Sequence, residues 1–88
     1  MTGQLVRSGT SIGANVCEAV KAQSKRDFIA KMSIAKKEAN EAQYWIRLLA
    51  AAEYLPEESG KELLRDVGEL IKILTSIIKK SQENIHNS

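Results

Sequence analysis

The chain has 88 residues, enough for one domain, because single domains typically run to about 50 to 200 residues. This length excludes a two-domain enzyme. Its 13 Lys and Arg against 11 Asp and Glu give a formal net charge of +2, too small to indicate nucleic-acid binding by itself.

The composition predicts an all-α protein with one helical domain over residues 1–88. Ala, Leu, Lys, Glu and Arg together supply 40 of the 88 residues, and Pro56 is the one proline. The single cysteine, Cys17, excludes an internal disulfide. The polar start is unlike a signal peptide, and no apolar run approaches the roughly 18 residues of a membrane span. We therefore expect a soluble, cytoplasmic protein with no membrane association.

The first predicted helix covers about residues 4–22. Small or apolar residues recur there at alternating steps of four and three, which places them on one helical face: Leu5, Gly9, Ile12, Val16 and Ala19. Gly9 and Gly13 each cost about 1 kcal/mol relative to Ala inside a helix. Their presence favours close approach of another helix to this one.

The second predicted helix covers about residues 25–54. Ser24 followed by Asp27 resembles an N-terminal capping box, and Pro56 ends the helix because proline disfavours helical backbone at the preceding residue. One apolar seam runs through Phe28, Met32, Ala35, Ala39, Ala42, Ile46 and Leu49. A neighbouring, partly apolar stripe runs through Ile34, Glu38, Glu41, Trp45 and Leu48, so this helix offers two adjoining faces, as a bundle member must.

The third predicted helix covers about residues 57–83, followed by a frayed tail at 84–88. Its seam is Leu63, Val67, Leu70, Leu74 and Ile77, beside a second row of Leu64, Ile71 and Ile78. Two short connections make the three helices run up, down and up as antiparallel neighbours. Three helices with two apolar seams each leave apolar surface uncovered, which predicts a fourth helix from elsewhere or self-association.

Residues 4–55 carry a recognisable combination of motifs. The stretch from Gln4 to Ala19, with its Arg, Ser, Asn and Glu spacing, resembles the signature of the bacterial four-helix bundle proteins named after the 23S rRNA intervening sequence. The turn at residues 24–28, the pattern of residues 34–41 and the segment 53–55 are also similar to that family. The third helix matches only as a pattern.

The resemblance implies a four-helix up-and-down bundle, of which this chain carries three helices. Members usually have one more helix before the position of Gln4, so we expect either a longer natural chain or closure of that groove by another chain. The family implies homo-oligomers, often pentameric rings, and no enzymatic activity. Related accessory proteins of diversity-generating retroelements are pentamers that bind nucleic acid and a reverse transcriptase. The family name records a gene location and is not evidence for rRNA binding.

Polar residues on the first two helices form a candidate cluster. In an antiparallel pair, Ser8 lies level with Glu41 and Ser11 with Glu38. The cluster comprises Arg7, Ser8, Ser11, Asn15, Glu18, Glu38 and Glu41. It either lines a pocket or subunit boundary, or it fixes helix register by mutual pairing, which we favour because buried polar groups must be paired.

Catalytic and metal chemistry find little support in the sequence. Bundle metal sites use Glu-x-x-His pairs, whereas the only histidine, His86, lies in the tail. We expect Cys17 to be a small buried thiol rather than a nucleophile. No Gly-rich phosphate loop or Ser/His/Asp set is present. We expect no enzyme activity, no metal and no cofactor.

Charge is distributed unevenly along the chain. Residues 21–37 carry six Lys and Arg against one Asp, a net charge of +5, whereas residues 38–70 carry three against eight Asp and Glu, a net charge of −5. An antiparallel bundle brings the basic segment to the same end as Lys79 and Lys80. The candidate nucleic-acid-binding residues are Lys21, Lys25, Arg26, Lys31, Lys36, Lys37, Lys79 and Lys80. In a monomer this end is an ordinary solvated surface, whereas a ring concentrates the charge into a basic rim that attracts phosphate.

Two functions follow from these observations. The first is an oligomeric, non-enzymatic adaptor that binds RNA or DNA through the basic rim, alongside a protein partner. The alternative is a structural or protein-interaction module with no nucleic-acid role. Aromatic platforms for single strands are scarce, since Phe28 belongs to the core seam and Tyr44, Trp45 and Tyr54 lie along or beyond the middle of the second helix.

Overall fold

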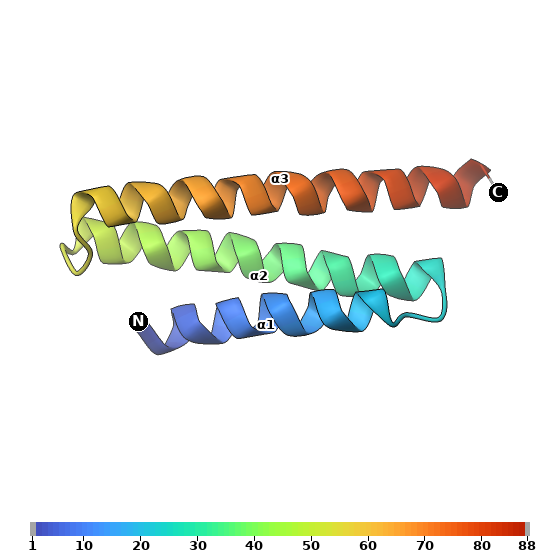
Figure 1. Ribbon diagram of the computed structural model, residues 1–88, viewed down its shortest axis with the longest axis horizontal. Helices are drawn as coiled ribbons and strands as arrows, with labels where there is room; N and C mark the ends of the chain where they lie inside the picture. Colours follow the sequence, from blue (N-terminus) through green and yellow to red (C-terminus); the bar gives the residue numbers. More distant parts are fainter. Residues whose placement is uncertain (1, 88) are drawn as a thin grey trace.

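The structure, a computed structural model, describes residues 2–87 and contains three α-helices. They are α1 (Thr2–Val20), α2 (Lys25–Ala51) and α3 (Glu57–Asn87). They run up, down and up (Figure 1), as predicted. The fold is all-α. α3 continues to Asn87, so the frayed tail predicted from residue 84 is wrong for the described part of the chain.

The start of α2 follows from its capping residue. The Ser24 hydroxyl accepts a hydrogen bond from the backbone N–H of Asp27 at 3.0 Å, with Ser24 in an extended conformation. This bond satisfies one of the orphan amides of the first turn, and the Asp27 carboxylate lies near the positive end of the helix dipole. The predicted N-terminal cap is confirmed.

The end of α2 comes three residues earlier than predicted. Glu53 adopts a left-handed conformation with φ of 63°, which breaks the helix before Pro56 is reached. The backbone N–H of Tyr54 then donates to the Leu49 carbonyl at 2.9 Å, and that of Glu53 donates to the Ala50 carbonyl at 3.1 Å. This is a Schellman closure with glutamate in the place that glycine usually holds.

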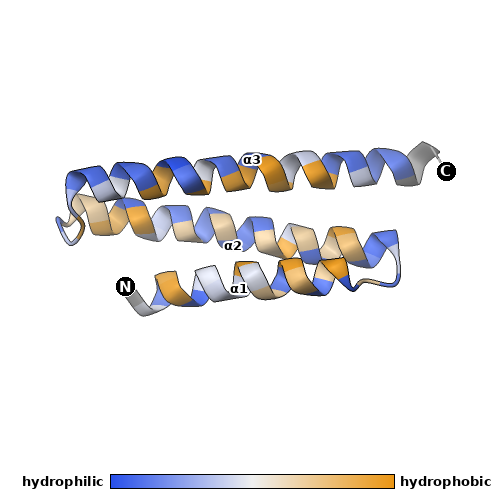
Figure 2. Cartoon of the chain, viewed as in Figure 1, coloured by the Kyte–Doolittle hydropathy of each residue, from blue (hydrophilic) through white to orange (hydrophobic). Residues whose placement is uncertain are grey.

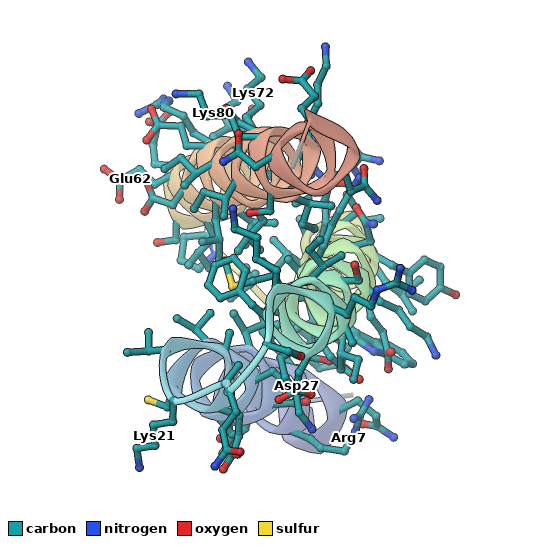
Figure 3. All side chains as sticks on the ribbon, turned by 90° about the vertical axis from the view of Figure 1, so that its right-hand side faces the viewer. Arg7, Lys21, Asp27, Glu62, Lys72 and Lys80 are labelled. Atoms are coloured by element: carbon teal, nitrogen blue, oxygen red, sulfur yellow. The ribbon has the colours of Figure 1, made fainter. Side chains whose placement is uncertain are left out.

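The three helices form one layer with α2 in the middle. Across residues 2–87, no Cα atom of α1 comes within 8 Å of a Cα atom of α3, whereas both helices pack along α2. The layer measures 49 × 20 × 13 Å. Figure 3, viewed along the helices, shows α2 displaced to one side of the line between α1 and α3, so the layer is bent.

The apolar core lies along α2. Its fully buried apolar residues are Ala19, Met32, Ala35, Ala39, Ala42, Ile46, Leu49 and Leu74. Among the residues of α3 up to 84, whose side chains the structure describes, only Leu74 belongs to this set. The rest of the predicted α3 seam is half-buried, and Leu63 is exposed. Figure 2 shows the outer edge of α3 as mainly polar. The third helix therefore has more apolar surface than one neighbour covers.

The inward face of α1 follows the predicted seam except at one position, Gly9. Gly9 and Gly13 are exposed, and a Cβ built on either meets no atom within 4 Å. Neither glycine therefore serves a close approach of α2 or α3. Among residues 3–20 of this helix, Ser8 and Ala19 are the buried ones, and Ala19 was predicted. The prediction was wrong at Gly9 because the polar Ser8 beside it takes the inward position.

The close approach occurs at Gly60 in the first turn of α3. Gly60 is buried, and a Cβ added at this position would lie 3.3 Å from the Ala50 Cβ of α2.

Within residues 2–87, no helix combines the length and apolar character that a membrane crossing needs.

Candidate functional site

Arg7 joins α1 to α2 through two carboxylates. Its guanidinium donates to the Glu38 carboxylate at 3.4 Å and, through its other terminal nitrogen, to the Glu41 carboxylate. The Arg7 side chain is 54% exposed, whereas the Glu38 and Glu41 side chains are 13% and 34% exposed. Of the mutual pairing expected within the cluster, the contacts of both glutamates with Arg7 are present. Because the Arg7 side chain is half-exposed, its removal should lower the free energy of unfolding by less than removal of one partner of a fully buried ion pair.

The other members of the predicted cluster do not join this ion pair. Asn15 donates to the Ser11 carbonyl at 2.9 Å and contacts the Ser11 hydroxyl at 3.3 Å, both within α1. Ser8 is fully buried, and its hydroxyl has no hydrogen-bond partner in the described part of the chain. Glu18 is exposed on α1. The seven residues are thus an ion-pair trio, a local serine–asparagine pair and two separate side chains.

One further buried polar group lies on α2. The indole N–H of Trp45 has no partner among the described residues, and its ring packs edge-to-face against Tyr44 with ring centroids 5.1 Å apart. Sequence reasoning placed Trp45 on a second, partly apolar stripe but gave no reason to expect an unpaired N–H. No chemical role follows from this group alone, because burial hides it from solvent.

One end of the layer gathers basic side chains. The α1–α2 turn and the C-terminal part of α3 lie at the same end (Figure 1), as the antiparallel order requires. We call this the basic end and define it by Lys21, Lys25, Arg26, Lys79 and Lys80, all exposed. Viewed from this end, Lys21 of the α1–α2 turn and Lys80 of α3 extend on the side of the layer away from α2 (Figure 3).

The other three candidate lysines lie farther along α2. Lys31 is half-buried almost two turns into the helix. Lys36 and Lys37 lie 11 and 12 positions after Lys25, roughly 16 to 18 Å along the axis at about 1.5 Å per residue. They are on the flank of the layer rather than at its end.

Acidic residues reduce the charge of the basic end but do not cancel it. Glu18, Asp27 and Glu83 lie at the same end as the five cations, which leaves five positive against three negative side chains, a net charge of +2. The opposite end, around the α2–α3 turn, carries four glutamates and one lysine: Glu53, Glu57, Glu58, Glu62 and Lys61. Lys61 pairs with Glu57 at 3.3 Å. The molecule is therefore polarised along its long axis.

A hollow opens in the surface at the basic end. Its volume is about 460 Å³, and it lies between the end of α1, the α1–α2 turn, the start of α2 and one residue of α3. The residues that line it are Ala19, Val20, Ala22, Gln23, Ser24, Lys25, Phe28 and Ser81. Phe28 was predicted to be a core residue. It packs against the core but is only half-buried, and it lines this hollow because α1 and α3, which both pack on α2, do not meet over it within residues 2–87.

Two further expectations concern reactive side chains. Cys17 was expected to be buried, but it is exposed: Val16 packs against the core, and the next residue of a helix with 3.6 residues per turn is rotated by about 100° from it. The side chain of His86 lies outside the described residues. Among those described, no three His, Cys, Asp or Glu side chains gather closely enough to hold a metal ion.

Comparison with known protein families finds a match for most of the chain. The model of the 23S rRNA-intervening sequence protein family matches residues 1–76. The chain belongs to this family. The resemblance inferred from residues 4–55 is confirmed, and the match extends through most of α3, which the sequence motifs alone did not reach.

A crystal structure at 1.70 Å resolution shares the family's helical arrangement with this chain. It is that of a Bacteroides thetaiotaomicron VPI-5482 protein of the S23 ribosomal protein family, described as having unknown function. The two chains are 53% identical, with a TM-score of 0.87 over 90% of this chain and 70% of the other. None of the curated proteins matches this chain. Family membership thus establishes the fold and leaves the function to be argued from the residues.

Proposed function

We propose that this protein is a non-enzymatic, oligomeric adaptor that binds nucleic acid electrostatically through its basic end. The observation that carries the proposal is the meeting of Lys21, Lys25 and Arg26 with Lys79 and Lys80, from segments more than fifty residues apart in the chain. Cations held on rigid helix ends neutralise phosphates without reading bases, so the binding has little sequence preference.

Self-association multiplies this patch. The support for an oligomer is apolar surface that one chain leaves uncovered: Val6, Val20, Ile34, Leu63 and Ile73 are exposed, and residues 57–84 of α3 bury one apolar side chain fully. Soluble monomers rarely leave large apolar patches in water. A ring with parallel subunits, such as the pentamer implied by family resemblance, turns a net charge of +2 per subunit into a continuous basic rim.

The same apolar surface supports one alternative, a protein-interaction module with no nucleic-acid role. A partner helix that docks on exposed Val, Ile and Leu side chains buries apolar area and responds little to salt. Phosphate neutralisation responds steeply, because bound cations are released when protein replaces them. Salt dependence therefore separates the two functions.

The test is a comparison of two charge-reversal variants by fluorescence anisotropy with a labelled duplex of arbitrary sequence. Lys25→Glu with Arg26→Glu removes two cations from the basic end, and both residues are exposed. Arg47→Glu with Arg65→Glu makes the same charge change at exposed positions elsewhere. The first variant should lose at least tenfold in affinity and the second should bind like the parent. Equal binding by the two double variants, or no binding by the parent at low salt, would contradict the proposal and favour the protein-interaction module.

A further inference from the structure

We infer that the hollow at the basic end holds one unstacked base of a single-stranded nucleic acid, so that the protein prefers single strands over duplexes. The inference rests on the proposed nucleic-acid binding and adds the form of the ligand. Its first support is size. The volume of about 460 Å³ lies within the roughly 300 to 1,000 Å³ typical of small-molecule sites.

The walls of the hollow suit a flat ring with polar edges. Phe28 offers an aromatic ring, and Val20 on α1 offers an apolar side chain that is 77% exposed. Stacking on an aromatic ring holds any base, because every base has a π-face. An isolated base and an exposed apolar wall both leave water when they meet, which favours the contact.

The rim of the hollow supplies polar partners for the edge of a base. Gln23 contributes an amide that both donates and accepts, and Ser81 contributes a hydroxyl. The Ser24 hydroxyl accepts from the Asp27 N–H, which leaves its own hydrogen free to donate. Gln23 and Ser24 sit on the α1–α2 turn and Ser81 sits on α3, so the backbone at all three positions is fixed by the fold rather than by the ligand.

The charge around the hollow matches the phosphates on either side of a base. Lys25 lines the hollow itself, Lys21 directly follows Val20 in the chain, and Lys80 directly precedes Ser81. A strand that places one base in the hollow therefore passes its backbone over cations from the α1–α2 turn, α2 and α3. A duplex meets the same cations, but its bases are stacked and paired and cannot enter without flipping.

The experiment compares the binding of single strands and of duplexes by variants that change the walls of the hollow. Phe28→Leu keeps an apolar side chain for packing and removes the ring, whereas Tyr44→Leu removes an exposed ring from the middle of α2 as the matched control. Anisotropy is measured with a single-stranded DNA 20-mer, an RNA of the same sequence and the corresponding duplex. Val20→Gln changes an exposed wall of the hollow, so its folding is not at risk.

Phe28→Leu should weaken single-strand binding by roughly 5- to 100-fold, the range for loss of one stacked base, with duplex binding and the salt slope unchanged. Val20→Gln should weaken it several-fold, and Tyr44→Leu should have no effect. A 2-aminopurine base in the strand should change its emission on binding to the parent but not to Phe28→Leu. If both hollow variants bind single strands like the parent while Lys25→Glu with Arg26→Glu does not, the inference is wrong and the proposed function stands. No binding by the parent overturns both.

Discussion

At the scale of single residues, α1 and α2 are held in register by Arg7. Its guanidinium reaches two glutamates one helical turn apart, so sliding α1 along α2 breaks both contacts. Glu38 is the more buried of the two glutamates. Loss of Arg7 would therefore leave the Glu38 carboxylate poorly hydrated and without the positive charge that Arg7 supplies. The trio therefore contributes specificity of pairing in addition to stability.

Arg7→Ala should lower the free energy of unfolding by about 1 to 2 kcal/mol, between the values typical of exposed and buried pairs. Lys61→Ala is the control, because Lys61 pairs with Glu57 on one exposed helix face and should lose under about 0.5 kcal/mol. Urea unfolding followed by circular dichroism measures both. Equal losses for the two variants would show that Arg7 is an ordinary surface residue.

Truncation of Ser8, unlike that of Arg7, should not lower the free energy of unfolding. Its buried hydroxyl has no partner among the described residues, so Ser8→Ala removes a desolvated polar atom and leaves the packing nearly unchanged. The variant should be as stable as the parent or more stable by about 1 kcal/mol. A loss of more than about 1 kcal/mol in the same urea assay means that the hydroxyl has a partner, which a neighbouring subunit would have to supply.

At the scale of helices, glycine positions distinguish open faces from close contacts. Gly9 and Gly68 meet nothing where a Cβ would lie, whereas Gly60 would place a Cβ against Ala50 at 3.3 Å. Gly9→Ala and Gly68→Ala should each stabilise the protein by about 0.5 to 1 kcal/mol through helix propensity. Gly60→Ala should gain less or lose stability, because α2 and α3 must move apart. Thermal melts of the three variants check this order, and a loss for Gly9→Ala would reveal a helix docked on that face of α1.

The helix-scale features differ in how far the sequence predicts them. Ser24 and Asp27 predicted the start of α2 because capping is local chemistry. The end of α2 was missed because the left-handed turn falls on Glu53, a residue type that does not signal it. The inward face of α1 was misassigned at Gly9, since periodicity alone does not decide between a buried serine and an exposed glycine.

The candidate site was predictable in part for a related reason. The antiparallel order alone brings the basic turn and the end of α3 together, so charge counting along the chain was sufficient. The hollow was not predictable, because Phe28 follows the core periodicity and only the absence of a covering helix in this structure leaves it half-buried. Seams predict which side chains face inward, and they do not predict whether anything covers them.

At the scale of the whole molecule, a bent layer of three helices leaves α3 half-covered. We expect a homo-oligomer at micromolar concentration, measured by gel filtration with light scattering. Ile71→Asp should dissociate or unfold it, because a charge placed on a half-buried apolar row of α3 loses water without gaining a partner. Lys72→Asp, at the next and exposed position, should leave the mass unchanged. A sharp monomer mass for the parent, with cooperative melting, contradicts the oligomer.

We propose that the basic end neutralises phosphates, and the slope of log affinity against log salt measures this neutralisation. If each of the five cations of one subunit meets one phosphate, the slope on a duplex should be roughly −4.5, since each contact contributes about −0.9. Lys25→Glu with Arg26→Glu should make the slope shallower by roughly 2 units, and Arg47→Glu with Arg65→Glu should leave it unchanged. A slope near zero for the parent, or the same slope for both double variants, would contradict nucleic-acid binding by the basic end.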